Sequence, residues 1–355
     1  MLLGKFGNMN NFHFVRLLAS IMVLFSHSFY LFSLKSIDPM HKISGGGFTF
    51  GNIGVYIFLI VSGYLITSSL LKSSNVLDFI WKRFLRVFPA MWVMILISVF
   101  LFAPLISKVS LSDYFKDSFN YTFLKNLLLY IPNNYKIPSV FVDNPIGTFN
   151  GSLWTIGYEV FFYVLLLFLF RNKVKNVRYL ILFQWIIFLL VQLYLGDRIA
   201  TYSYSTPLLL NLNIEHFFRL FIYFESGVLL YLFNEVIFKR KTMLIYVFVC
   251  IIVFSIFGIS NLFIEIILPP TIIFFAISNS VFSFVEKLGD LSYGMYLYGY
   301  IIQQYIVSLK ITFLNEYYLF LFSLIVSSII AYISWNLVEK RFLSFKNYFG
   351  NAHIH

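Results

Sequence analysis

Residues 52–71 read NIGVYIFLIVSGYLITSSLL, an apolar stretch without a charged side chain. A helix needs about 20 such residues to cross the hydrocarbon core of a bilayer. The whole chain of 355 residues is 60% hydrophobic and 12% charged, whereas a soluble domain is roughly 45–50% apolar and about 25% charged. This composition disfavours a soluble enzyme, a nucleic-acid-binding protein and a disordered scaffold.

On both sides of this stretch, apolar segments of similar length follow one another along the chain. We count ten, near 12–32, 52–71, 88–107, 152–170, 179–195, 214–234, 243–259, 262–280, 291–309 and 317–337. They predict an all-α, polytopic integral membrane protein with about ten transmembrane helices. We expect one membrane domain over residues 1–345 and a short cytoplasmic tail over 346–355. A shorter apolar stretch at 121–131 is expected to lie in the interface or to re-enter the membrane.

The distribution of basic residues predicts the orientation. The net charge of +11 arises from 26 Lys and Arg against 15 Asp and Glu, and most of the basic residues fall in short connectors on one side of the predicted spans. The positive-inside rule therefore places both termini in the cytoplasm. The first apolar segment has no small-residue cleavage site after it, so we interpret it as a retained helix rather than a signal peptide.

Two titratable side chains occupy similar predicted depths on different helices. His27 lies eleven residues after Arg16 in the first segment, and Glu159 lies seven residues after Ser152 in the fourth. Inserting a charged side chain into the hydrocarbon region of a bilayer costs roughly 2.5–3.5 kcal/mol, so each of these residues should have a structural or functional role that offsets the cost. A His beside a carboxylate suits proton transfer. The alternative is that both groups satisfy polar neighbours inside the helix bundle.

Arg83 and Arg86 are three residues apart just before the third segment, and hence on one helical face. Two guanidinium groups at this spacing can chelate phosphate oxygens. The alternative is that they are topology anchors at anionic headgroups. The small residues around Gly54 and Gly63 indicate close helix packing.

The sixth segment is unusually polar. Glu215 and Arg219 are four residues apart and are expected to pair. Glu225 lies deeper, and we interpret it either as a pathway residue or as the partner of another helix. The single cysteine, Cys250, excludes a disulfide framework and a thiolate metal cluster. We predict no metal site.

Six short motifs, taken in order, resemble the acyltransferase 3 family of integral-membrane acyltransferases. The motifs are Arg16-Leu17-Leu18-Ala19 with Val23 and His27, Gly54-Val55-Tyr56-Ile57-Phe58 with Ser62-Gly63-Tyr64-Leu65, Arg83-Phe84-Leu85-Arg86 with Pro89, Ser152-Leu153-Trp154 with Glu159 and Phe162-Tyr163, Leu291-Ser292-Tyr293-Gly294-Met295-Tyr296-Leu297, and Val338-Glu339-Lys340-Arg341-Phe342. The chain departs from the family pattern twice. His13 stands where an acidic residue is frequent, and Gly299 stands where a histidine is frequent.

The resemblance implies an O-acetyltransferase of the bacterial cytoplasmic membrane. It would move an acetyl or other short acyl group from cytoplasmic acyl-CoA to a hydroxyl of a glycan outside the membrane. The expected acceptor is a cell-surface or lipid-linked glycan such as O-antigen, capsule or exopolysaccharide. Acetyl-CoA would act as cosubstrate, with no permanently bound cofactor and no nucleic-acid partner.

The resemblance also implies residue roles. His27 would be the general base or would carry the acyl group, and Glu159 would orient His27. The expected donor-binding residues are Arg16, Arg83, Arg86, Ser62, Gly63 and Tyr64. Ser152 and Trp154 are expected on the acceptor side.

Two other functions stay open from the sequence. A polysaccharide or lipid-linked glycan transporter or flippase also uses many helices with buried charges. A sensor or scaffold of a polysaccharide assembly complex is the third possibility. Product formation that depends on a thioester would distinguish the enzyme from the transporter. The scaffold would be favoured if the missing histidine at Gly299 abolished catalysis.

Overall fold

A computed structural model of the chain describes residues 10–129, 135–171, 176–203, 213–237, 246–247, 249, 252, 254, 261–278 and 282–349. For residues 171, 195–203, 261 and 283 only the backbone is described. Within these ranges every regular element is a helix and no strand occurs. The predicted all-α class is therefore confirmed.

Each long helix overlaps one of the predicted apolar segments, though some of the bounds differ. Their bounds are α1 Phe12–Phe32, α3 Phe50–Lys72, α4 Val76–Ile97, α7 Trp154–Arg171, α8 Val177–Ser203, α9 Ile214–Leu232, α12 Asn261–Ile277, α14 Leu291–Ser308 and α15 Glu316–Ser334. The shorter helices are α2 Pro39–Ile43, α5 Ala103–Ile106, α6 Leu111–Lys116, α10 Asn234–Ile237, α13 Ser283–Lys287 and α16 Lys340–Leu343. Short 3₁₀ and π segments, η1 Ser98–Phe102, η2 Ser118–Leu128, η3 Gly151–Leu153, η5 Trp335–Glu339 and η6 Ser344–Asn347, continue or connect them.

Among the described residues, six helical stretches are long and apolar enough to cross a membrane. They are Phe12–Phe32, Phe50–Lys72, Val76–Ile106, Gly151–Phe170, Val177–Tyr194 and Glu316–Asn347. The total of about ten stays a prediction. The predicted span at 243–259, which contains Cys250, lies largely outside the described residues, and so do residues 350–355 of the predicted tail.

The third long helix begins earlier than its hydropathy predicts. We expected it at 88–107, but α4 begins at Val76. The side chain of Asn75 caps the helix by accepting from the backbone N–H of Asp78, and Asp78 pairs with Lys82 at 2.7 Å. A capping side chain and an ion pair between residues four apart stabilise a polar first turn. A search for apolar segments leaves such a polar turn out.

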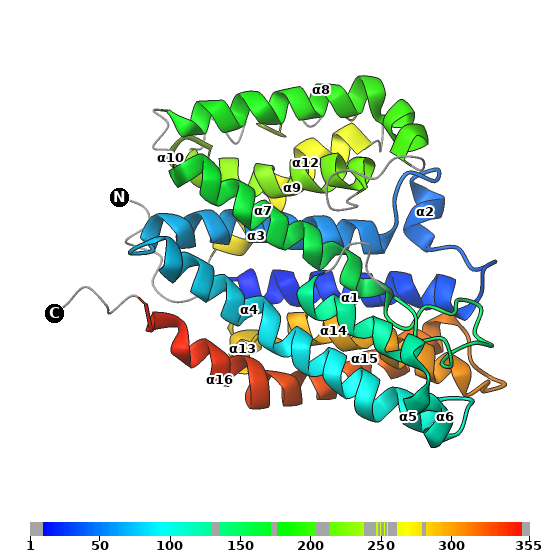
Figure 1. Ribbon diagram of the computed structural model, residues 1–355. Helices are drawn as coiled ribbons and strands as arrows, with labels where there is room; N and C mark the ends of the chain where they lie inside the picture. The colour runs from blue at the N-terminus through cyan, green and yellow to red at the C-terminus, as the bar shows by residue number, and fades with distance from the viewer. Residues whose placement is uncertain are drawn as a thin grey trace.

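The long helices lie side by side in one bundle, as Figure 1 shows. The start of α1, α10 and α16 lie at one end, which we call the α16 end. The short helices α2, α5 and α6 lie at the opposite end, the α2 end. This arrangement agrees with a bundle whose helices alternate in direction along the chain.

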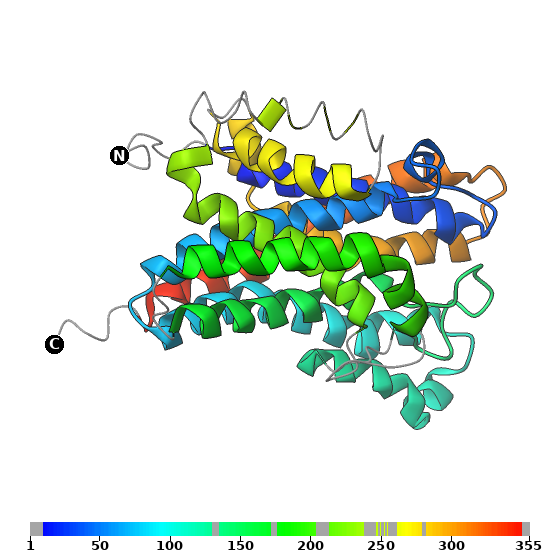
Figure 2. The same ribbon diagram turned by 90° about the horizontal axis from the view of Figure 1, so that it is seen from above.

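The apolar stretch predicted at 121–131 neither spans nor re-enters the bundle in its described part. It forms η2, which packs on α4 at the α2 end (Figure 2). Trp92 Nε1 of α4 donates to the Leu127 carbonyl at 2.8 Å, and the Phe123 side chain is fully buried. The segment therefore covers the side of α4.

Close packing around α3 depends on glycines, as the sequence indicates. A Cβ added at Gly63 would collide with the Phe224 carbonyl of α9, and one added at Gly227 of α9 would collide with the Ile60 carbonyl of α3. Gly54 similarly faces the Ala19 carbonyl of α1. Small residues let helix backbones approach in a membrane, where no hydrophobic force drives association.

Candidate functional site

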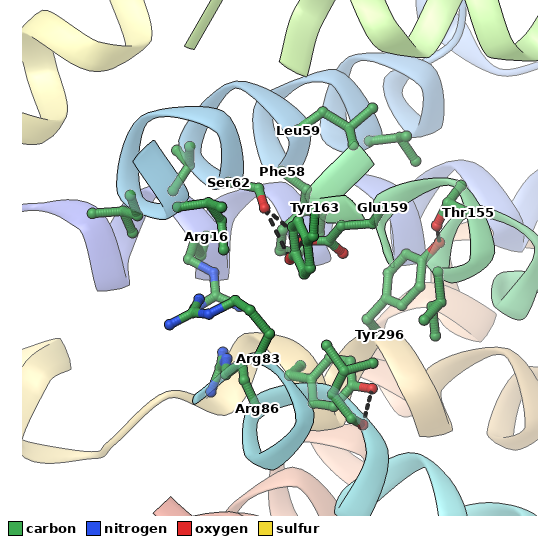
Figure 3. A pocket seen from close by; sticks show the side chains of 17 residues that line it. Arg16, Phe58, Leu59, Ser62, Arg83, Arg86, Thr155, Glu159, Tyr163 and Tyr296 are labelled. Atoms are coloured by element: carbon green, nitrogen blue, oxygen red, sulfur yellow. Dashed lines mark hydrogen bonds between the residues drawn. The ribbon is translucent and has the colours of Figure 1, made fainter. Parts of the chain in front are cut away.

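A cavity lies between α1, α3, α4, α7 and α14 (Figure 3). Its polar lining consists of Arg16, Ser62, Arg83, Arg86, Thr155, Glu159, Tyr163, Tyr293 and Tyr296. Its apolar lining consists of Val55, Phe58, Leu59, Val61, Leu65, Ile66, Val87 and Ile156. On α7 the polar residues Thr155, Glu159 and Tyr163 recur every four positions, so one stripe of the helix faces the cavity.

Asp290 holds two of the three cavity arginines. This carboxylate is 3% exposed; its Oδ2 accepts from Arg16 and, at 2.5 Å, from Arg86 Nη2. Its Oδ1 accepts from the Ser292 hydroxyl at 2.5 Å and caps the start of α14. Burial by itself would raise the pKa of Asp290, but Arg16 and Arg86 outweigh it and hold that pKa well below its usual value.

Arg86 has a second acidic neighbour, whereas Arg83 has no carboxylate within 4 Å in the described part of the chain. Arg86 Nη1 lies 3.7 Å from Glu339 Oε2, and its guanidinium lies 5.6 Å from the centre of the Tyr293 ring. Arg83 Nη2 donates to the Ser69 hydroxyl at 3.3 Å, and its buried Nε has no described partner. Of the three cations, Arg83 is therefore the one whose charge is least compensated by protein.

Glu159 forms a small hydroxyl network in the middle of the cavity. The Ser62 hydroxyl of α3 donates to Glu159 Oε1 at 2.6 Å, and the Tyr163 hydroxyl donates to the same oxygen. The hydroxyls of Ser62 and Tyr163 lie 3.1 Å apart. Both donors bind the same oxygen, and no described residue hydrogen-bonds Glu159 Oε2, so this second oxygen can accept a hydrogen bond from a bound molecule.

We expected Glu159 to lie beside His27, but the structure does not bring the two side chains together. The His27 ring instead packs edge-on against the rings of Tyr30 and Tyr300, with centroids 5.4 and 5.2 Å away. His27 does not line the cavity, and no interaction between it and Glu159 occurs among the described residues.

The predicted depth was misleading because α7 does not start at the surface. Phe149 and Asn150, just before it, are fully buried, and a Cβ at Gly151 would lie 2.7 Å from the Tyr300 ring. Gly151 is therefore level with Tyr300 and its neighbour His27. Glu159, eight residues further, lies about 12 Å closer to the α16 end at 1.5 Å per residue.

Gly63 and Tyr64, predicted to line the donor channel with Ser62, lie outside the cavity lining. Gly63 faces α9. Tyr64 stacks on Phe12 with ring centroids 5.6 Å apart and meets Tyr231 edge-on at 5.2 Å. These two residues follow Ser62 around α3, so their side chains point to other neighbours.

The predicted acceptor-side residues also lie away from the cavity. The Ser152 backbone N–H donates to the Asn150 side chain at 3.0 Å, and Ser152 is buried. The Trp154 ring packs against His216 of α9 at 4.8 Å. Both residues therefore belong to the junction at which α7 begins.

The polar sixth segment behaves partly as predicted. Glu215 and Arg219 pair at 3.4 Å, which confirms the expected ion pair. Glu225 is 2% exposed, and neither of its oxygens has a hydrogen-bond partner among the described residues. It borders a small space lined by apolar side chains of α7, α8 and α9, such as Leu166 and Ile181.

Reasoning from sequence did not assign roles to several residues of this site. Four of them stand inside the quoted motifs, namely Tyr163, Tyr293, Tyr296 and Glu339, and Thr155 lies within the fourth motif, directly after Trp154. Asp290 directly precedes the motif at 291–297. The sequence does mark Asp290 as a helix N-cap, because an Asp followed by an apolar run is typical of that position.

Comparison with known proteins agrees with the motifs. Residues 9–336 match the model of an acyltransferase domain family. An O-acetyl transferase of Shigella phage Sf6 is 26% identical over 366 aligned residues, which cover 94% of this chain and 96% of that protein. Nodulation protein 10 of Rhizobium leguminosarum bv. viciae is 32% identical over 45% of this chain and 44% of its own length.

A third relative, the peptidoglycan O-acetyltransferase OatA of Listeria monocytogenes, is 34% identical over 37% of this chain and 22% of its own length. No solved structure matches the chain. The family match extends over nearly all of the chain and agrees with its apolar helices. The protein therefore belongs to this acyltransferase family and is an acyltransferase with several membrane-type helices.

Proposed function

We propose that this enzyme transfers an acetyl group, or another short acyl group, from acyl-CoA in the cytoplasm to a hydroxyl of a glycan outside the membrane. Two of the relatives carry O-acetyltransferase in their names, and one of these is named for peptidoglycan. A surface or lipid-linked glycan of a bacterium is the acceptor class that this proposal assigns. The protein would lie in the cytoplasmic membrane with about ten spans and both termini inside.

The observation that carries the proposal is the charge distribution of the cavity. Arg16, Arg83 and Arg86 line one side of it (Figure 3), and Asp290 occupies two of them. Arg83 is left to bind an anion, so it would hold a phosphate of the donor, with Arg86 contributing its field. The donor would enter from the α16 end.

Glu159 takes a different role from the one that the sequence predicts. Its free oxygen and the Ser62 hydroxyl lie on the cavity wall, where they can accept hydrogen bonds from the amide N–H groups of the donor's flexible arm. We assign Glu159 to holding that arm in register, with Tyr163 fixing the carboxylate. The thioester would then extend toward His27.

His27 would act as the general base. Its ring nitrogens bond none of the described residues, so one of them is available to take the proton of the acceptor hydroxyl. The hydroxyl oxygen attacks the thioester carbonyl carbon and the carbon–sulfur bond breaks. The leaving thiolate then takes the proton from the imidazolium, so the transfer is balanced without another reactant. In the alternative mechanism His27 itself carries the acyl group, which moves first from the thioester to the imidazole and then from the imidazole to the acceptor hydroxyl.

The test is mass spectrometry of the surface polysaccharide from cells that carry the intact gene, no gene, His27→Ala or His41→Ala. His41 is the matched control, because it lies on the short helix α2, whereas His27 lies on α1 against the Tyr300 ring. We expect an acyl mass increment with the intact gene and with His41→Ala only. A general base contributes about 10²–10⁴-fold to the rate, so His27→Ala should lose the increment.

Membrane levels of each variant must be measured on the same cells. Retention of the increment in His27→Ala at normal protein levels would refute the role of His27. Identical glycans in all four strains would refute a surface polysaccharide as the acceptor.

A further inference from the structure

The cavity closes at a hydrogen bond between α7 and α14. The hydroxyls of Thr155 and Tyr296 lie 2.5 Å apart, and the two residues are 8% and 9% exposed. Figure 3 shows this pair on the side of the cavity opposite Arg16, Arg83 and Arg86. The Phe58 ring of α3 supports Tyr296 edge-on at 5.7 Å.

Two helices place this pair one turn short of His27. Tyr300 follows Tyr296 by four residues on α14, about 6 Å along the helix, and its ring contacts His27. Gly151 precedes Thr155 by four residues and lies against the same Tyr300 ring. The hydrogen-bonded pair of Thr155 and Tyr296 therefore lies between the cavity and His27 on both α7 and α14.

The packing of α3 on α1 independently places the end of the cavity at the same level. Val55 is its lining residue nearest the α2 end. Gly51, four residues beyond Val55, packs against Ser26 of α1, with 2.9 Å from its ideal Cβ to the Ser26 hydroxyl. Ser26 is the neighbour of His27, so the cavity again ends about one turn before the histidine.

We propose that Thr155 and Tyr296 form a gate between the donor cavity and His27, which opens when donor and acceptor are both bound. This inference rests on the proposed function, because a donor and an acceptor on opposite faces must meet within the bundle. A closed site protects a reactive thioester from water, and in many enzymes substrate binding moves the segments that seal the active site. The pair consists of positioning residues that act through His27.

With the gate closed, water at His27 cannot reach the thioester. With it open and no glycan present, water replaces the acceptor hydroxyl: the oxygen of water attacks the carbonyl, the carbon–sulfur bond breaks, and free acid and thiol result. Loss of the hydrogen bond should therefore uncouple thioester cleavage from transfer. Acceptor-independent hydrolysis is the readout that a merely structural role would not increase.

The experiment measures thiol release from acetyl-CoA by the purified full-length enzyme in detergent, with no glycan present. Thr155→Val and Tyr296→Phe remove one hydroxyl each and keep the shape of the side chain. We expect hydrolysis to rise about tenfold in each, because one hydrogen bond biases an equilibrium by up to about that factor. Thr155→Ser keeps the hydroxyl and should behave as the wild type.

Combining each variant with His27→Ala should abolish the added hydrolysis, since the escaping reaction uses the same base. Unchanged hydrolysis in both folded variants would overturn the gate, and so would a rise that persists in the combined variants. If one variant fails to fold, as judged by size-exclusion chromatography, the other decides the matter. Failure of the proposed function looks different, because then neither wild type nor variants release thiol, and membranes that contain native glycan acquire no acetyl label.

Discussion

Asp290→Asn tests whether the arginines of the cavity are held by one buried charge. Asn keeps the shape and the capping ability of Asp, so α14 should still begin at Leu291. The variant removes the charge that faces Arg16 and Arg86. Removing one partner of a buried ion pair costs about 3–5 kcal/mol, because the other charge is left uncompensated. That is a large part of a typical free energy of unfolding of about 5–15 kcal/mol.

The chain contains a matched control at its surface. Asp143 also faces two cations, Lys108 and Lys310, but it is 46% exposed and the two lysines are 54% and 70% exposed. Pairs of this kind contribute about 0–1 kcal/mol. We therefore expect Asp290→Asn to lower the free energy of unfolding by about 3–5 kcal/mol and Asp143→Asn by less than about 1 kcal/mol.

The assay is unfolding of the purified protein in mixed micelles by titration with a denaturing detergent. Arg16→Gln added to Asp290→Asn should cost less than the sum of the two single changes, because it removes one uncompensated charge. A loss in Asp290→Asn no larger than in Asp143→Asn would mean that water already screens the buried cluster and that Asp290 does not hold the arginines.

The pH dependence of this effect follows from the sign of the shift. The folded-state pKa of Asp290 is lowered from an unfolded value of about 3.9. The stabilisation by Asp290 is therefore complete above the unfolded value and is lost only as the pH falls below it. Between pH 5 and 8 the difference in stability between wild type and Asp290→Asn should stay constant.

Three further predictions concern single residues. Arg83→Gln should raise the acyl-CoA concentration needed for half-maximal rate by about tenfold or more, since a hydrogen bond to a charged group contributes about 1.5–3 kcal/mol. The control Lys82→Gln should change this concentration little, because Lys82 pairs with Asp78. Gly63→Ala should severely reduce the amount of folded protein, because the added Cβ would collide with α9. Gly147→Ala should not, because its added Cβ would lie 3.8 Å from its nearest neighbour, the Phe141 carbonyl oxygen. Equal yields of the two variants would contradict this packing. Glu225→Leu should raise stability in the detergent titration, because burying a carboxyl that no described residue hydrogen-bonds is costly. A lower stability would contradict this prediction.

The helices were predictable because each carries its own signal. The predicted segment 12–32 coincides with α1, and 291–309 differs from α14 by one residue. The pair of Glu215 and Arg219 was equally predictable, since spacing on one helix determines it. The acyltransferase class followed from the order of six motifs, and the family match bears it out.

Contacts between helices were not predictable in the same way. The depth of Glu159 depended on where α7 starts, and the loop before it folds inward, so Phe149 and Asn150 are buried. The grouping of Ser62 with Gly63 and Tyr64 failed because adjacent residues on a helix face different directions. Asp290 was missed because its two arginines come from α1 and α4, far away in the sequence.

The charge balance of the cavity explains why neighbouring arginines can have different functions. Arg83 and Arg86 share one face of α4, yet Arg86 contacts Asp290 and lies 3.7 Å from Glu339. Arg83, within the described ranges, hydrogen-bonds a serine hydroxyl and no carboxylate. A guanidinium already paired with carboxylates gains little from a phosphate, whereas a poorly compensated one gains a full charge-assisted hydrogen bond. Exchanging Asp290 for Asn would thus free Arg86 for an anion even as it destabilises the fold. Tighter donor binding by a less stable variant is the combination that a purely structural role for Asp290 would not produce.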